Sequence, residues 1–382
     1  MNIKWSVPKK QSWFERYTSQ PHQLFFSFAT IFSIVIMGAT FLSLIGKNID
    51  FRLFHGFGFL FGLFTNAFLG FLLTVIPKYT ISSPIKQNIY IPAWIGYELG
   101  ILIGLFIDES LGKMITAITL LFIVFEFFNI IKAGEGKNKK ESTVLNILLF
   151  FGAILLFIEV FTGLYLSVFI FWSYLCGITF VVAQRMVPAF YSQLIVSPWK
   201  KPTYLLEISL LLLFLIGISL ELHLQNVLLV SSFVSILFFG YVIYKLDIFH
   251  KNVPSILWIL SVAFVWFEIG IISLFVETLF EVYTLKLSLH IMALGFIGSL
   301  LIGFGSRVIM GHSNPPQSIV ADRLTTSIFM FLQVIVLMRI TASILVIFGS
   351  PISSGFLHLA SFSWIVLFLI WGNRYKKSLF TL

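Results

Sequence analysis

The sequence has few charged residues and almost no cysteine, and both shortages exclude whole classes of protein. Asp, Glu, Lys and Arg make up 11% of its 382 residues, whereas a soluble domain has about 25%. A chain of this length that is 58% hydrophobic needs lipid as its solvent. The single cysteine, Cys176, excludes an internal disulfide, a zinc site made of cysteines and the Cys-x-x-Cys-His attachment of c-type haem. Because Cys176 lies in an apolar run, we expect a small buried hydrophobic residue there.

Common catalytic and nucleotide-binding motifs are also missing. The sequence contains no P-loop, no Gly-x-Gly-x-x-Gly after a strand, no His-Glu-x-x-His and no nucleophile elbow around a serine. Its net charge of +9 is spread over short loops and is not gathered into one basic patch. We therefore expect membrane lipid, and no nucleic acid, as the surroundings of the folded chain.

Long apolar runs are what the sequence has in abundance. About twelve such runs, each of roughly 18 residues or more, predict membrane-spanning helices. The expected helices are about 23–45, 54–77, 90–107, 113–132, 143–162, 165–188, 203–220, 226–244, 254–276, 283–310, 325–348 and 354–372. The prediction is thus an all-α polytopic membrane protein with a single transmembrane domain over 1–382. It comprises an N-terminal segment over 1–22, a helical bundle over about 23–372 and a C-terminal tail over 373–382.

Charge alternates between successive loops. Every second loop is rich in lysine or arginine, as at Lys137, Lys139 and Lys140, and the intervening loops carry acids, as at Glu277 and Glu281. Positively charged loops stay in the cytoplasm. The alternation therefore predicts that the lysine-rich loops and both termini are cytoplasmic, and it supports the helix count.

Three of the expected helices end alike. The second ends in TVIP at 74–77, the sixth in RMVP at 185–188 and the tenth in RVIM at 307–310. These endings lie four helices apart and on the same side of the membrane. The spacing is compatible with three four-helix repeats, with chance similarity between apolar helix ends as the alternative.

Histidines near helix ends are the first candidates for chemistry, because ionisable groups within a membrane are rare and commonly functional. His55 and His290 lie near the outer ends of the second and tenth helices, and His312 follows the cytoplasmic end of the tenth. At ~1.5 Å per residue, His290 and His312 are roughly 33 Å apart, so one metal ion cannot bind both. We predict that His55 and His290 meet and serve one metal ion or one haem, with a structural role for each as the alternative.

A second candidate group lies at the cytoplasmic side. Arg185, Arg307 and His312 are expected there as one polar cluster that shares an anion such as a carboxylate. The alternative is that the arginines reach to the lipid headgroups. As a metal ligand, His312 has only His22 and His250 as histidine partners at that depth.

Three segments carry a family resemblance. Residues 54–80 begin FH and end GFLLTVIPKYT, residues 184–190 read QRMVPAF, and residues 289–313 begin LH and end RVIMGHS. In order and spacing they resemble the NnrS family. That family has Trp-His-x-His-Glu followed by Gly-Phe-Leu-Leu-Thr-x-x-Pro-x-Trp-Thr, then Gly-Arg-x-x-Pro-x-Phe, and finally a Leu-His run ending Arg-Val-x-x-Gly-His-Thr-Gly. One departure stands out: Phe57 and Gly58 occupy the places of the family's second histidine and glutamate, so a site that needs both is lost or altered.

The resemblance implies a twelve-helix protein of the bacterial inner membrane that contains haem and copper. Its implied role is in the response to nitric oxide and nitrosative stress, with nitric oxide or a related small molecule as ligand. It leaves open whether the protein is an enzyme, a sensor or a protective binder. The implied cofactor-binding residues are His55, His290, Arg185 and Arg307, and the implied metal ligands are His55, His290 and His312. A secondary transporter without haem is the alternative, because twelve helices with buried carboxylates fit that class too.

Overall fold

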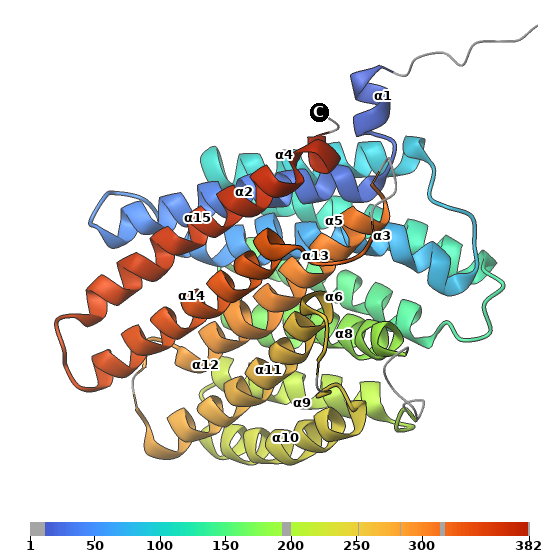
Figure 1. Ribbon diagram of the computed structural model, residues 1–382. Coiled ribbons are helices and arrows are strands. Elements are labelled where there is room, and N and C mark those ends of the chain that lie inside the picture. Colours follow the sequence, from blue (N-terminus) through green and yellow to red (C-terminus); the bar gives the residue numbers. More distant parts are fainter. Residues whose placement is uncertain (1–11, 193–199, 251, 283, 314–317, 381–382) are drawn as a thin grey trace, which may run out of the picture.

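The computed structural model describes residues 12–192, 200–250, 252–282, 284–313 and 318–380, and all regular structure within these ranges is helical (Figure 1). The elements are α1 (Trp13–Tyr17), α2 (Pro21–Leu44), η1 (Leu53–Thr65), α3 (Asn66–Thr80), α4 (Gln87–Phe106), α5 (Glu109–Ala133), α6 (Lys140–Thr162), α7 (Ser167–Phe169), η2 (Ile170–Leu175), α8 (Cys176–Tyr191), α9 (Leu205–Glu221), α10 (Gln225–Leu246), α11 (Ser255–Phe280), α12 (Leu287–His290), η3 (Ile291–Gly298), α13 (Ser299–Gly311), α14 (Arg323–Ile347) and α15 (Ser353–Phe380). Residues 1–11, in the predicted N-terminal segment, lie outside the description.

Eleven helices in the described part of the chain are long and apolar enough to cross a membrane. They match eleven of the twelve predicted ranges. The remaining range, 203–220, corresponds to α9, which has 17 residues. At 1.5 Å per residue this helix is about 26 Å long, a little less than the roughly 30 Å thickness of a bilayer core. The chain is therefore an all-α, multi-pass membrane protein.

Three spans form the interior of the bundle. In the apolar windows of the spans 53–80, 167–191 and 287–311, 89%, 89% and 72% of the residues are buried, against 39–61% in the other spans. Each inner span contains a π-helical stretch (η1, η2 or η3) that continues into an α-helix (α3, α8 or α13). These are the second, sixth and tenth predicted helices. Spans four helices apart thus share deep burial and a π-helical first part, and the three four-helix repeats stay a prediction.

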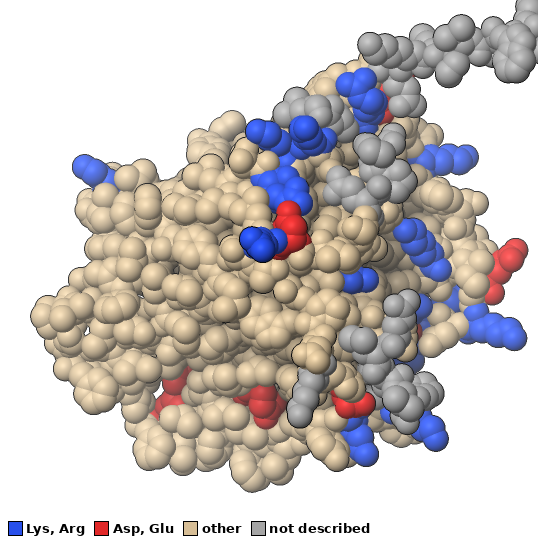
Figure 2. Space-filling view, viewed as in Figure 1, with Lys and Arg blue, Asp and Glu red and all other residues tan. Residues whose placement is uncertain are grey.

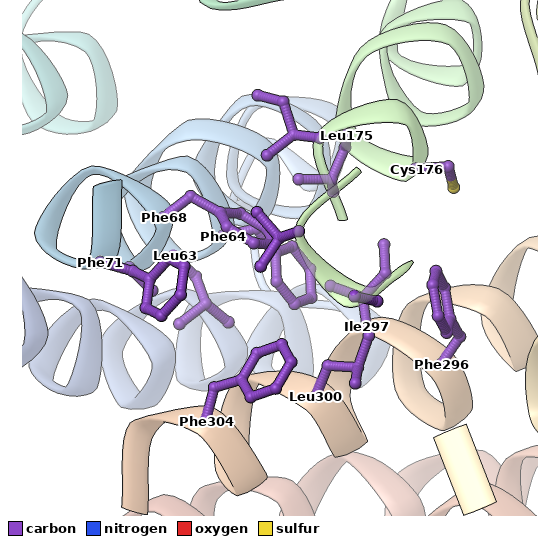
Figure 3. Packing of buried hydrophobic residues seen from close by; sticks show 14 of the residues in the cluster. Leu63, Phe64, Phe68, Phe71, Leu175, Cys176, Phe296, Ile297, Leu300 and Phe304 are labelled. Carbon is purple, nitrogen blue, oxygen red and sulfur yellow. The ribbon is translucent and has the colours of Figure 1, made fainter. Parts of the chain in front are cut away.

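The inner spans pack through large apolar side chains. Phe64 and Phe68 from the η1–α3 span approach Leu300 and Phe304 of α13 (Figure 3). Cys176 is fully buried, as the sequence predicted. Helices in lipid associate through close packing of this kind, because lipid tails are as apolar as the side chains.

Most of the lateral surface of the bundle carries no charged side chains. In the view of Figure 2, Lys and Arg gather towards the upper and right-hand edges of the molecule, near the end of α15, and the broad face between is mostly uncharged. Large apolar side chains such as Phe125 and Phe161 are more than half exposed. Such a surface suits lipid contact.

The last helix is longer than the sequence predicted. The expected helix ends at 372, whereas α15 continues to Phe380. Tyr375 and Leu379, four residues apart, are buried and extend one apolar face of the helix. The indole of Trp13 donates a hydrogen bond to the carbonyl of Phe380, at 2.9 Å. Residues 373–380 of the predicted tail therefore form about two further turns of helix, which pack on the N-terminal part of the chain.

A buried ion pair joins two neighbouring spans. Nζ of Lys113 on α5 lies 2.7 Å from a carboxylate oxygen of Glu109 and 2.7 Å from one of Glu159 on α6. The second oxygen of Glu159 accepts a hydrogen bond from the amide of Leu166, at 2.7 Å. The side chains of Lys113 and Glu159 are 5% and 4% exposed. This arrangement ties α5, α6 and the start of α7 together.

Lys113→Met is expected to destabilise the protein by about 3–5 kcal/mol, because it leaves the buried charge of Glu159 without its cation. Lys140→Met is the control, since Lys140 pairs with Glu207 at an exposed site, where an ion pair contributes little to stability. Unfolding in detergent, followed by circular dichroism against denaturant, measures both. Equal losses in the two variants would contradict the structural role given to Lys113.

Candidate functional site

A cavity lies among the three inner spans, at the end of the bundle where they begin. Its volume is about 360 Å³, which is within the usual range of roughly 300–1,000 Å³ for small-molecule sites. Residues of α2, η1, α7, η2, α12, η3, α14 and α15 line it, and most of them are apolar or aromatic. Its polar lining includes His55, Lys286, His290 and Arg339. We call it the imidazole cavity.

The two histidines of this cavity face each other. The ring centroids of His55, in η1, and His290, the last residue of α12, are 5.8 Å apart and the rings are inclined by 30°. Phe51 stacks on His55 at 4.8 Å, and Phe59 meets it edge-on at 5.2 Å. Nδ1 of His55 is buried and has no hydrogen-bond partner among the described residues. The sequence expectation that these helices bring the two imidazoles to one depth agrees with this geometry.

The tautomer of His290 depends on two competing neighbours. Its Nδ1 lies 2.8 Å from the carbonyl oxygen of Lys286 and 3.1 Å from Nη2 of Arg339. The carbonyl only accepts and the guanidinium only donates, so Nδ1 serves one of them at a time. Arg339 is held in place by donating to the carbonyl of Leu285, at 2.7 Å, and to the hydroxyl of Ser343, at 2.5 Å. When Nδ1–H donates to Lys286, Nε2 is free to bind a metal, and this is the usual arrangement of a metal-binding histidine.

Sequence reasoning missed two residues of this cavity. They are Arg339 and Lys286, and nothing in the sequence motifs above points to either. Arg339 lies within an apolar run, 49 positions after His290, and only the packing of α14 brings the two together. The usable signal was the cost of an arginine within a membrane, which commonly marks a functional site.

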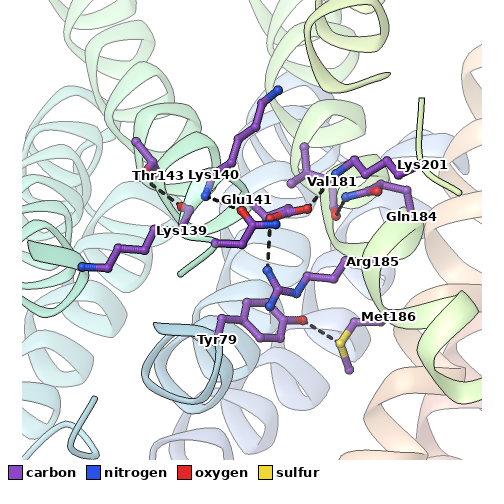
Figure 4. Close-up of polar contacts among 11 residues, drawn as sticks. Tyr79, Lys139, Lys140, Glu141, Thr143, Val181, Gln184, Arg185, Met186 and Lys201 are labelled. Carbon is purple, nitrogen blue, oxygen red and sulfur yellow. Dashed lines mark hydrogen bonds and ion pairs between the residues drawn. The ribbon is translucent and has the colours of Figure 1, made fainter. Parts of the chain in front are cut away.

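Arg185 belongs to a different group of charges, near the C-terminal end of α8. Its guanidinium lies over the ring of Tyr79, at 3.7 Å from the centroid, and its Nη1 lies 3.1 Å from a carboxylate oxygen of Glu141. Lys201 approaches the other oxygen of Glu141, at 2.6 Å. Figure 4 shows Glu141 between the two cations. Arg185 is therefore neutralised by a carboxylate of the chain itself.

Arg307 and His312 each have partners of their own. Arg307 lies over the ring of Phe190, at 3.8 Å, and its Nε has no hydrogen-bond partner among the described residues. His312 contacts Lys78 and His22, with its ring centroid 5.0 Å from that of His22. Within the described part of the chain, no hydrogen bond or ion pair connects Arg185, Arg307 and His312 with one another.

His22, and not His250, is the histidine that meets His312. His250 instead lies 2.6 Å from the carbonyl oxygen of Asp247 and packs near the ring of Tyr191. Among the described residues, no group of three or more His, Cys, Asp or Glu side chains is arranged to hold a metal ion. The chain thus offers imidazoles in pairs, one pair at each end of the inner spans.

The comparison with protein families agrees with the sequence resemblance. A family model described as NnrS protein matches residues 16–381, which is nearly the whole chain and includes both histidine pairs. No curated protein matches the sequence.

Proposed function

Because the chain belongs to the NnrS family, we propose that it is a haem-binding protein of the bacterial inner membrane that acts in the response to nitric oxide and nitrosative stress. We further propose that the haem occupies the imidazole cavity. The observation that carries this proposal is the pair of stacked imidazoles, His55 and His290, that line one mostly apolar cavity.

The residues present fit a haem. A macrocycle supplies four nitrogen ligands to its iron, so one or two imidazoles complete the site without a third protein ligand. Aromatic and aliphatic walls suit the flat ring, and Lys286 and Arg339 bring positive charge for its carboxylates. His55 has an unpartnered buried nitrogen, which a ligand in the cavity would explain.

Each residue has a distinct part in this proposal. When bound, a haem iron supplies a position for a diatomic ligand such as nitric oxide, and the polarity of the pocket decides what it does there. His290 would hold the metal through Nε2, with its Nδ1–H donating to the carbonyl of Lys286. His55, whose ring lies 5.8 Å from that of His290, would be the second imidazole in contact with the bound group. Phe51 and Phe59 hold the ring of His55 and exclude water from it.

The absorption spectrum of the protein purified in detergent tests the proposal. A strong band near the blue edge of the visible region, one that shifts when nitric oxide is added, is expected together with iron in a metal analysis. Copper, which the family also implies, is a competing occupant of the same imidazole pair, and the metal analysis distinguishes it from iron. A colourless protein without iron or copper would refute the haem assignment and leave the transporter reading.

We also propose that both termini and the lysine-rich loops are cytoplasmic. Cys176 is fully buried, so a cysteine introduced at Lys137 or Glu281 would be the only accessible thiol. A membrane-impermeant maleimide added to intact cells is expected to label Glu281→Cys directly and Lys137→Cys only after lysis. Labelling of both in intact cells would contradict this topology.

A further inference from the structure

A glutamate and an asparagine meet inside the bundle. Glu98 lies on α4 and Asn66 is the first residue of α3, each near the middle of a membrane-spanning stretch. The amide nitrogen of Asn66 donates a hydrogen bond to Oε2 of Glu98, at 3.1 Å. The two residues are 0% and 4% exposed, and neither lines the imidazole cavity. They form a buried polar pair that the haem proposal does not use.

One oxygen of each side chain has no partner. Oε1 of Glu98 and Oδ1 of Asn66 are buried and accept no hydrogen bond from the described residues. Buried polar atoms are rarely left in this state. A proton on Oε1 turns that oxygen into a donor, and Oδ1 of Asn66 is an acceptor on the side chain that already bonds Glu98. A single proton therefore satisfies both oxygens.

No cation stabilises a charge on Glu98. Among the described residues, no lysine, arginine or histidine forms an ion pair with it. The titratable groups that interact with it are the phenols of Tyr17 and Tyr97. An unpaired carboxylate inside a membrane is costly, so Glu98 holds a proton. The other titratable groups on the helices that pack on α4 lie towards the helix ends: His22 on α2, His55 on η1, and Glu109, Lys113, Glu126 and Lys132 on α5.

Polar atoms continue from Glu98 towards α1. Trp94 lies one turn before Glu98 on α4, and its indole Nε1 is buried with no hydrogen-bond partner among the described residues. The ring of Tyr17, on α1, meets that of Trp94 edge-on, at 6.4 Å. The hydroxyl of Tyr17 bonds that of Ser27, at 2.6 Å. Between the α1 end of the bundle and the carboxyl, these groups offer hydrogen bonds to water.

We propose that Glu98 is a proton-binding site that exchanges its proton with water at the α1 end of the bundle, past Trp94 and Tyr17. On release, the O–H bond of the carboxyl breaks and the proton joins a water molecule to give hydronium. The carboxylate keeps the hydrogen bond from Asn66. Uptake is the reverse step, and no electron moves. Carboxyls of this kind serve proton relays in membranes. The site rests on its own geometry and is independent of the haem proposal.

Labelling with dicyclohexylcarbodiimide tests the site in the full-length protein in detergent. A protonated carboxyl adds its O–H across one C=N bond of this apolar reagent, and the acyl group then moves to nitrogen as a stable acylurea, which mass spectrometry locates. We expect a label on Glu98, at a rate that falls severalfold as the pH rises. Glu98→Gln is expected to lose this label. Glu268→Gln is the matched control and keeps it, because Glu268 is another unpartnered carboxyl, on α11.

Two further variants separate proton binding from a purely structural hydrogen bond. In Asn66→Leu the carboxylate form of Glu98 loses its donor, so labelling is expected to persist to higher pH than in the wild type. The infrared C=O band of the protonated carboxyl, absent in Glu98→Gln, is expected to shift in D₂O. This shift is expected to be several-fold slower in Tyr17→Phe, which removes one hydroxyl of the route. All variants are expected to elute from gel filtration like the wild type.

Three results would overturn the proposal. The first is the absence of both the label and the infrared band of Glu98, and the second is a labelling rate that does not depend on pH. The third is protection from the label by Na⁺ at constant pH, which would identify a metal cation as the ligand. Equal rates of the D₂O shift in Tyr17→Phe and the wild type would overturn the exchange route.

Discussion

His290→Ala is expected to lower the haem content of the purified protein by more than about tenfold, because even the loss of a hydrogen-bond partner of a metal ligand costs 10–100-fold in metal affinity. His55→Ala is expected to shift the haem spectrum or its response to nitric oxide, since His55 faces the same space. The haem-to-protein ratio, from absorbance and total iron, measures both effects.

His358→Ala is the matched control for these variants. His358 lies on α15 near the same end of the bundle and packs against Phe41, at 5.8 Å, but it is not among the residues that line the imidazole cavity. Its replacement is expected to leave the haem content unchanged. Normal haem content in both the His55 and the His290 variants would give these histidines a structural role and move the haem elsewhere.

Gly112→Ala is expected to separate α4 from α5 and to destabilise the protein by about 3 kcal/mol or more, at the upper end of the effects of overpacking. A Cβ on Gly112 would lie 2.1 Å from the Cα and the backbone nitrogen of Gly104, and 2.6 Å from the carbonyl oxygen of Gly100. These are backbone atoms, so relief requires a helix to move. Small residues let two helices approach this closely in a membrane.

Gly38→Ala provides the comparison for this prediction. Gly38 lies within α2, and a Cβ there would meet no atom within 4 Å. Alanine at this position is expected to be neutral or to stabilise the helix by up to about 1 kcal/mol. Thermal unfolding in detergent measures both variants. If Gly112→Ala unfolds at the wild-type temperature, the close contact of α4 and α5 is not as the structure describes it.

The sequence indicated how deep in the membrane a residue lies, but it did not indicate which residues of other helices lie beside it. His55 and His290 were expected to share a layer, because each lies near the start of a span that runs in the same direction, and the structure brings their rings together. His22 and His250 were equally placed as partners of His312. Only the packing of α2 beside the α3 and α13 ends decides for His22.

The same limit explains the arginines. Arg185 was expected to hold an external anion, but Glu141, 44 positions away in the sequence, supplies the carboxylate. Arg339 received no role from the sequence, yet it lines the imidazole cavity and contacts His290. Which partner a charged side chain meets depends on the direction in which it leaves its helix, and therefore on how that helix is rotated about its own axis. In a span that is apolar on all sides, no periodic pattern of polar residues shows which face of the helix points inward.

The sequence alone determines how many apolar spans there are and in which order they follow. It also indicates which polar residues lie near the same end of a span. The reason is that the thickness of a bilayer sets the length of every apolar run. The three similar helix ends, four helices apart, also mark the three spans that share a π-helical first part. The tertiary structure alone decided which spans are interior, where the π-helical stretches lie, which histidines pair and which cations reach the imidazole cavity. These depend on the packing of helices side by side in a solvent as apolar as their own surfaces, where van der Waals fit and a few polar contacts set the arrangement.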